Sequence, residues 1–101
     1  MSFINIGFGN IINTDKITAI ILPDSAPAKR LIQKARERDL CIDATQGRRT
    51  RGVIITEGDQ VVLSALVPET IAGRIEAQKE HGLHDEDVEG DEDGGREEHE
   101  E

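Results

Sequence analysis

The chain has 101 residues, enough for one domain, and a formal net charge of −9. Residues 1–80 hold 11 Lys and Arg against 10 Asp and Glu, whereas residues 81–101 hold one Arg against 11 acidic residues. A segment so acidic and so poor in apolar residues cannot bury enough surface to offset the entropy of ordering. We therefore predict a folded domain over 1–80 and a disordered acidic segment over 81–101.

Cysteine usage and hydropathy exclude secreted and membrane-spanning classes. Cys41, the only cysteine, lies in an apolar run, so we expect a buried free thiol, and no intramolecular disulfide can form. The longest apolar run, residues 19–22, is far shorter than the roughly 20 residues of a membrane span. The N-terminus lacks the basic and apolar regions of a signal peptide. These features favour a cytoplasmic protein with no membrane partner.

The first half of the domain is predicted to contain strands followed by a helix. Residues 3–6 indicate a short strand, and after a glycine-containing break residues 11–12 form a brief extended piece. Residues 17–22 have apolar side chains at both odd and even positions, which is typical of a central strand covered on both faces. Ser25 is a suitable N-cap for a helix with apolar residues at helical spacing, ending near residues 38–39.

The second half is predicted to contain three strands and a second helix. Residues 40–44 form a short strand, and residues 52–56 and 61–65 form two β-branched runs. Gly58-Asp59 between these runs indicates a hairpin, since glycine supplies a positive φ without steric cost. Pro68 opens the second helix. The order strand, strand, helix, strand, strand, strand, helix predicts a small α/β (α+β) domain with a mixed sheet.

The composition of the core favours self-association. A domain of about 80 residues buries only roughly 60% of its unfolded surface. Phe3 and Phe8 are the only aromatic residues, so the core must be built from aliphatic side chains. Small aliphatic domains gain stability when they bury a face against copies of themselves. We therefore expect a homo-oligomer.

A cluster of arginines in an otherwise acidic chain is the main functional signal. Arg48, Arg49 and Arg51 lie within four positions, between Gly47 and Gly52. Guanidinium groups present a planar fork of donors that suits phosphate, and nucleic acid is the polyanion that best rewards several of them together. The alternative that stays open is a solvated loop whose arginines pair with neighbouring carboxylates: Asp39, Asp43 or Glu57.

Other basic residues give weaker signals. Lys29 and Arg30 fall in the first turn of the first predicted helix, where cations oppose the helix dipole. A bound phosphate would relieve that conflict, although nearby acidic side chains could do the same. Lys16, between a turn and a strand, is by itself typical of a solvating surface side chain.

The sequence offers no catalytic constellation in the folded part. All three histidines lie in residues 81–101, so Cys41 has no base partner and no catalytic triad can form. The glycines at residues 7–10 lack the spacing and helix context of a dinucleotide-binding loop. We therefore expect a protein that is not an enzyme, with no catalytic residue, metal site, cofactor or small-molecule substrate.

Four blocks in chain order carry a family resemblance. They are residues 3–10, 23–30, 43–51 and 63–70, with the sequences FINIGFGN, PDSAPAKR, DATQGRRTR and LSALVPET. Together they resemble the extracellular-matrix regulator family (RemA-like proteins) over roughly residues 1–76. Ordered blocks are far more specific than any one of them alone.

The resemblance implies a function and an assembly. Members of the family are bacterial cytoplasmic DNA-binding proteins that regulate transcription, notably of biofilm-matrix genes. They form closed rings of seven or eight subunits, with a fold similar to LytTR-type DNA-binding domains. The family's DNA contacts fall on Arg48 and Arg49 here, and on Lys16, where lysine keeps the charge but loses the planar fork of an arginine.

We therefore predict a ring-shaped transcription regulator that binds double-stranded DNA through a repeated arginine-rich face. The alternative is an oligomeric scaffold whose basic face binds an acidic protein segment instead of DNA. The predicted DNA contacts are Lys16, Arg48, Arg49 and Arg51, with Lys29 and Arg30 as possible additional phosphate contacts.

Overall fold

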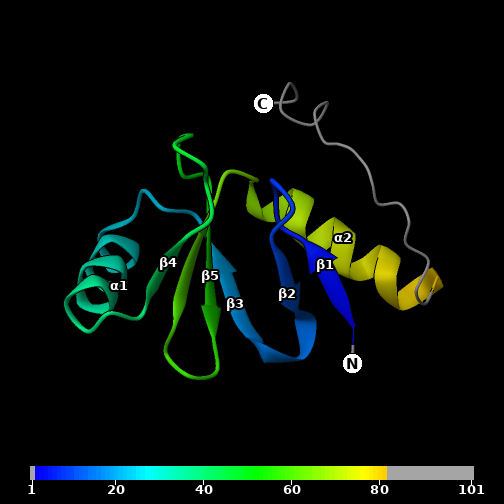
Figure 1. Cartoon of the computed structure of the whole chain (residues 1–101), viewed down its shortest axis with the longest axis horizontal. Helices are drawn as coiled ribbons and strands as arrows, with labels where there is room; N and C mark the ends of the chain where they lie inside the picture. The colour runs from blue at the N-terminus through cyan, green and yellow to red at the C-terminus, as the bar shows by residue number, and fades with distance from the viewer. Residues whose placement is uncertain (1, 82–101) are drawn as a thin grey trace.

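The computed structural model describes residues 2–81, and residues 82–101 of the predicted acidic segment lie outside the described residues. Two helices, six strands and one 3₁₀ turn make up this part of the chain (Figure 1). In chain order they are β1 (Phe3–Asn5), β2 (Ile11–Asn13), η1 (Thr14–Lys16), β3 (Ile17–Ile21), α1 (Ala26–Glu37), β4 (Cys41–Asp43), β5 (Gly52–Thr56), β6 (Val61–Ser64) and α2 (Pro68–His81). The predicted small α+β class with two helices and a mixed sheet is confirmed.

The predicted order omitted one strand. Three strands precede α1, because Ile11–Asn13 pairs antiparallel with β1 and places Ile12 opposite Ile4. The two form a separate two-stranded sheet. A run this short shows no periodicity of its own, and the partner that makes it a strand lies earlier in the chain.

The main sheet has four strands in the order β3-β5-β6-β4. β4 runs parallel to β6, whereas the β3–β5 and β5–β6 pairs are antiparallel. The prediction that residues 17–22 form a central strand is wrong, because β3 lies at an edge and β5 and β6 occupy the centre. Apolar residues at both odd and even positions indicate that packed layers lie on both faces of a strand. β3 has a packed layer on each face, although it has only one neighbouring strand in the sheet.

Two aliphatic clusters lie on opposite faces of this sheet. On one face, Ile54 and Val62 pack with Ile4 of β1 and Ile71 of α2. On the other face, the alternate residues of β5 and β6 pack against α1 through Ala35. The β1–β2 pair and α2 therefore cover one face, and α1 covers the other, at opposite flanks of the view in Figure 1. Cys41, predicted to be buried, is only half-buried because β4 is the other edge strand.

Local signals set the ends of the elements largely as predicted. Ser25 caps α1, since its hydroxyl oxygen accepts the Ala28 N–H at 3.2 Å. The helix ends at Glu37, and Asp39 adopts a positive φ of 61° just beyond it. The β5–β6 hairpin is confirmed, but the positive φ lies at Asp59 (66°) and not at the neighbouring Gly58.

A buried serine connects the two sheets. Ser64 is fully buried, and its hydroxyl donates to the Ile6 carbonyl at 2.8 Å while accepting the Leu66 N–H at 3.0 Å. The Ser64 carbonyl accepts the Arg51 N–H at 2.9 Å. One residue therefore fixes the end of β1, the start of β5 and the approach to α2.

Gly52 is required by a close approach of two backbones. A Cβ at this position would lie 2.5 Å from the Leu66 carbonyl oxygen. We expect Gly52→Ala to destabilise the protein by about 1–3 kcal/mol, the usual cost of overpacking a core, in urea denaturation. The matched control is Gly58→Ala, because a Cβ there would meet nothing within 4 Å. Equal free energies of unfolding for the two variants would contradict this packing.

Candidate nucleic-acid interface

The arginine segment, residues 48–51, begins with a tight turn between β4 and β5. This turn, residues 45–48, is called the arginine turn below. The Arg48 N–H donates to the Thr45 carbonyl at 2.9 Å, and Gln46 and Gly47 have φ values of 56° and 80°. Positive φ at both central positions is the mark of a type I′ turn, and Gly47 supplies one of them without strain. Arg48 and Arg49 leave this turn exposed to solvent, whereas Arg51 is half-buried where β5 begins.

Asp43 and Thr45 brace the base of the turn. The Thr45 hydroxyl donates to Asp43 Oδ1 at 2.6 Å, and the Thr45 N–H donates to the same oxygen at 3.0 Å. These two hydrogen bonds, aided by the charge of Arg36, hold the pKa of the Asp43 carboxyl below its ordinary value. The Asp43 carboxylate is therefore engaged by the turn and not by the arginines that follow it.

Arg48 and Arg49 have no acidic partner within the described part of the chain. No ion pair joins either guanidinium to a carboxylate among residues 2–79, and Glu57 pairs with Lys16 instead, at 3.7 Å. Two of the carboxylates expected to neutralise the cluster are thus committed elsewhere. Exposed guanidinium groups held at a fixed turn are available to an external anion.

A second turn lies beside the arginine turn. Residues 7–9 connect β1 to β2, and the guanidinium carbon of Arg48 lies 5.6 Å from the centroid of the Phe8 ring. The Asn10 side chain donates to the Ala44 carbonyl at 3.4 Å, so the two turns also touch through their bases. Figure 1 shows both connections at the same end of the molecule. The sequence did not indicate this neighbourhood, because residues 7–10 were interpreted as a glycine-containing break between strands and lie far from residues 45–51 in the chain.

The structure does not bring Lys16 to the arginine turn within one chain. Lys16 pairs with Glu57, which follows β5, whereas Arg51 precedes β5. Five residues of strand separate the two ends by roughly 16 Å. Lys29 and Arg30 are exposed in the first turn of α1, on the flank that covers the other sheet face. Only Arg48, Arg49 and Arg51 thus form a contiguous cluster.

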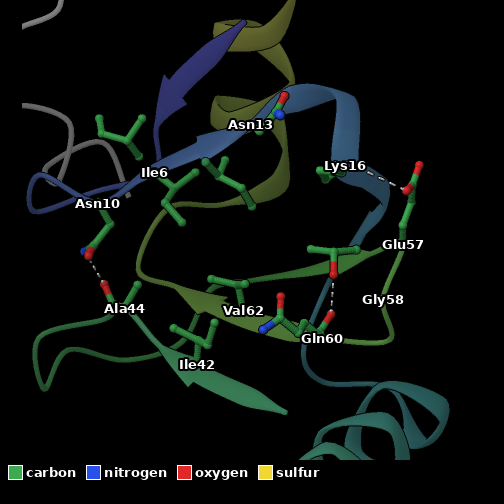
Figure 2. A pocket seen from close by; sticks show the side chains of 13 residues that line it. Ile6, Asn10, Asn13, Lys16, Ile42, Ala44, Glu57, Gly58, Gln60 and Val62 are labelled. Carbon is green, nitrogen blue, oxygen red and sulfur yellow. Dashed lines mark hydrogen bonds and ion pairs between the residues drawn. The ribbon is translucent and has the colours of Figure 1, made fainter. Parts of the chain in front are cut away.

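An open apolar cavity of about 630 Å³ lies between β2 and the β4–β6 edge of the main sheet. Its aliphatic lining comes from Ile6, Ile11, Ile12, Ile42 and Val62. In Figure 2 the Asn10–Ala44 contact lies at one end of this cavity and the Lys16–Glu57 pair at the other. Such a lining can bind apolar surface, and the Lys16–Glu57 ion pair is the charged feature of its rim.

The brace at the base of the arginine turn makes stability depend on pH. The pKa of Asp43 is lower in the folded than in the unfolded protein. The contribution of its carboxylate to the free energy of unfolding is therefore complete above the unfolded pKa of about 3.9, and it is lost as the pH falls through the folded pKa. We expect Asp43→Ala to cost about 0.5–1.5 kcal/mol at neutral pH, because an exposed carboxylate gains little more than an ordinary hydrogen bond.

Denaturant unfolding at several pH values measures this cost. The difference between wild type and Asp43→Ala should shrink at acidic pH. In a double-mutant cycle, Thr45→Val should be largely non-additive with Asp43→Ala. A difference that is constant with pH would show that the Asp43 carboxylate does not brace the turn.

Comparison with known proteins places the chain in a family. The model of the extracellular matrix regulatory protein A-like (RemA-like) family matches residues 3–75. Similar proteins bear the name "Putative regulatory protein" in several bacteria. The relative in Caldicellulosiruptor saccharolyticus is 57% identical over 88% of both chains. The relative in Acetivibrio thermocellus is 53% identical over 88% of this chain and 96% of its own.

The matched region holds the features described above. Residues 3–75 include the Phe8 turn, the arginine turn, both sheets, α1 and the first part of α2. A third relative, in Heliobacterium modesticaldum, is 58% identical over 78% of this chain and 87% of its own. With a family match over most of its length and relatives above 50% identity, the chain belongs to the RemA-like family of regulatory proteins.

Proposed function

We propose that this protein is a DNA-binding transcription regulator that contacts the duplex through the arginine segment. The observation that carries the proposal is the exposure of Arg48 and Arg49 on a braced turn, without an acidic partner in residues 2–79. The regulatory names of the relatives favour a role in gene control. The description of the matching family names extracellular-matrix regulation. We expect extracellular-matrix and biofilm genes as the targets and the bacterial cytoplasm as the compartment.

The chemistry of the cluster favours contacts to the DNA backbone. Arginines neutralise phosphates and release condensed counterions, which makes the affinity steeply dependent on salt. Backbone contacts fix register but carry little sequence information. Arg51, half-buried at the start of β5, lies closer to the sheet and contributes to the same positive field. Sequence preference would then arise mainly from DNA shape.

Self-assembly into a ring is part of the same proposal. Several large apolar side chains are exposed on the single subunit, among them Ile11 and Ile42 beside the open cavity and Leu22 after β3. An 80-residue domain that exposes such groups gains by burying them against copies of itself. A closed ring of seven or eight subunits, with the LytTR-type fold of the family, would repeat a weak arginine site and increase its affinity by multivalency.

The remaining predicted contacts depend on this assembly. Lys16 lies at the end of the sheet opposite the arginine turn, so it can share a DNA segment with Arg48 and Arg49 only if the duplex spans the subunit or a neighbouring copy supplies it. Lys29 and Arg30 would add phosphate contacts from α1 on the same condition. No helix described in residues 2–81 has the length and hydropathy to cross a membrane.

Removing the two exposed arginines tests the proposal. We expect Arg48→Ala/Arg49→Ala to weaken duplex binding at least about tenfold at low salt in fluorescence anisotropy. The slope of log K against log salt should fall by about 0.9 for each phosphate that the variant no longer neutralises. The control is Lys34→Ala/Lys79→Ala, which removes the same charge from two other exposed positions. Equal affinities for the two double variants would exclude the arginine turn as the DNA site.

The acidic segment distinguishes the proposal from the scaffold alternative. Residues 82–101 carry 11 acidic residues and one arginine, so they complement the arginine cluster in charge. If DNA is the ligand, deleting residues 82–101 should leave duplex affinity unchanged or raise it, because a competing polyanion is removed. If the arginines serve to hold this segment in a scaffold, the deletion should disrupt assembly, as native mass spectrometry would show, without any gain in DNA binding.

A further inference from the structure

The placement of the two aromatic residues is unusual for so small a domain. Both sheet faces are packed with aliphatic side chains, while Phe3 and Phe8, the only aromatics, are 47% and 48% exposed. A phenylalanine buries more apolar surface than any aliphatic residue, so a core normally uses it first. Phe8 is the more informative of the two, because of the backbone that carries it.

Phe8 is held in a conformation that a phenylalanine rarely adopts. Gly7, Phe8 and Gly9 have consecutive φ values of 114°, 54° and 80°. For a bulky side chain this costs free energy, and it persists only where the surroundings impose it. The turn is imposed by Asn5, whose side chain accepts the Gly7 N–H at 2.7 Å, and by Asn10, whose side chain donates to the Gly7 carbonyl at 2.8 Å.

This rigid turn presents the ring beside the arginine segment. The guanidinium of Arg48 lies over the ring at 5.6 Å from its centroid, and the Asn10–Ala44 hydrogen bond fixes the two turns together. Leu66 lies beside both the Phe8 turn and the start of β5, since its Cγ would lie 3.7 Å from a Cβ at Gly7 and its carbonyl oxygen 2.5 Å from a Cβ at Gly52. The exposed ring and the exposed guanidinium therefore belong to one surface.

We propose that Phe8 is a DNA-contacting residue, which enters the minor groove while Arg48 and Arg49 contact the phosphates at its edges. The inference rests on the proposed DNA-binding function. A minor groove about 6 Å wide admits a turn tip but not a helix. Apolar side chains in this groove partly unstack a base step and bend the duplex toward the major groove, and flanking arginines favour the narrow groove's negative potential.

The charge beside the ring favours DNA over a second copy as the occupant. If another subunit covered Phe8, the Arg48 guanidinium 5.6 Å away would also be desolvated, and it has no carboxylate partner within residues 2–79. Burying such a charge without a partner is strongly unfavourable. A duplex meets both needs, because phosphates pair with the guanidinium while deoxyribose and base edges cover the ring.

In this arrangement Phe8 acts as a wedge, an apolar side chain inserted between two base pairs. A wedge implies a preference for DNA sites that deform easily. Pyrimidine–purine steps such as TA unstack at the least cost, so they should be favoured where Phe8 enters. The specificity would follow from bending, although the protein makes few contacts to base edges. A ring of such subunits would bend DNA at regular intervals.

The test compares the two exposed phenylalanines in the full-length protein. We expect Phe8→Ala to bind a TA-containing duplex about tenfold more weakly than wild type, with the same salt slope, because an apolar contact releases no counterions. Arg48→Ala should instead lower the slope. Phe3→Ala, equally exposed in β1, should bind like wild type. Phe8→Leu keeps an apolar side chain without a ring, and should fall between wild type and Phe8→Ala.

A local probe tests the groove itself. With 2-aminopurine at the TA step, wild type should raise the fluorescence by unstacking the base, and Phe8→Ala should not. Saturating the duplex beforehand with a minor-groove ligand of the netropsin type should abolish wild-type binding. Wild-type binding that persists on the blocked groove would overturn the proposal.

The remaining outcomes separate this inference from the proposed function. Wild-type affinity in Phe8→Ala, combined with weak binding by Arg48→Ala, would overturn the wedge and keep the DNA site. Loss of assembly in both Phe8→Ala and Phe8→Leu by native mass spectrometry would also overturn the wedge. It would assign the Phe8 side chain to an interface between subunits. Failure of wild type itself to bind any duplex would overturn both.

Discussion

The hydrogen bonds of Ser64 and the close backbone packing at Leu66 determine where the exposed charges lie. Ser64 is fully buried and bonds to Ile6, Leu66 and Arg51, which come from three separate parts of the chain. Leu66 in turn packs so closely on β5 that only glycine fits at position 52. The start of β5, the end of β1 and the approach to α2 are thereby fixed relative to one another. The Phe8 turn follows the end of β1 and the arginine turn precedes the start of β5, so both turns of the candidate site are held by this arrangement.

This arrangement explains how a small acidic protein keeps arginines exposed at a defined position. The turn is held by its own backbone hydrogen bond and by Asp43, whose carboxylate accepts two hydrogen bonds from Thr45. The guanidinium groups of Arg48 and Arg49 form no ion pair within residues 2–79, so they are available to an anionic ligand. The hydrogen bonds fix the backbone that carries these two side chains, which lowers the entropy lost on binding compared with a flexible loop.

Local chemistry allowed much of the fold to be predicted. Ser25 as an N-cap, Gly58-Asp59 as a hairpin and Pro68 as a helix start each act within a few residues, and the structure has an element boundary at each. What the sequence could not provide was the order of strands in the sheet. The edge position of β3 and the pairing of β2 with β1 depend on partners distant in the chain, which periodicity does not reveal.

Part of the candidate site could likewise be predicted from local sequence, whereas the rest depends on residues distant in the chain. The Arg48–Arg51 cluster is contiguous in sequence, so its composition alone predicted it. That Phe8 lies beside it, and that Lys16 lies at the other end of β5, follow only from the three-dimensional arrangement. In the sequence, the signal that could have indicated Phe8 was an aromatic residue between two glycines in a chain with only one other aromatic, Phe3.

Hydrogen–deuterium exchange of the full-length protein with and without a duplex tests the central claim most directly. If the two turns form one DNA-binding face, peptides covering residues 6–10 and 45–51 should both exchange more slowly in the complex, while the second half of α2 should be unaffected. Protection confined to α2, or slower exchange in neither turn at saturating DNA, would contradict the account.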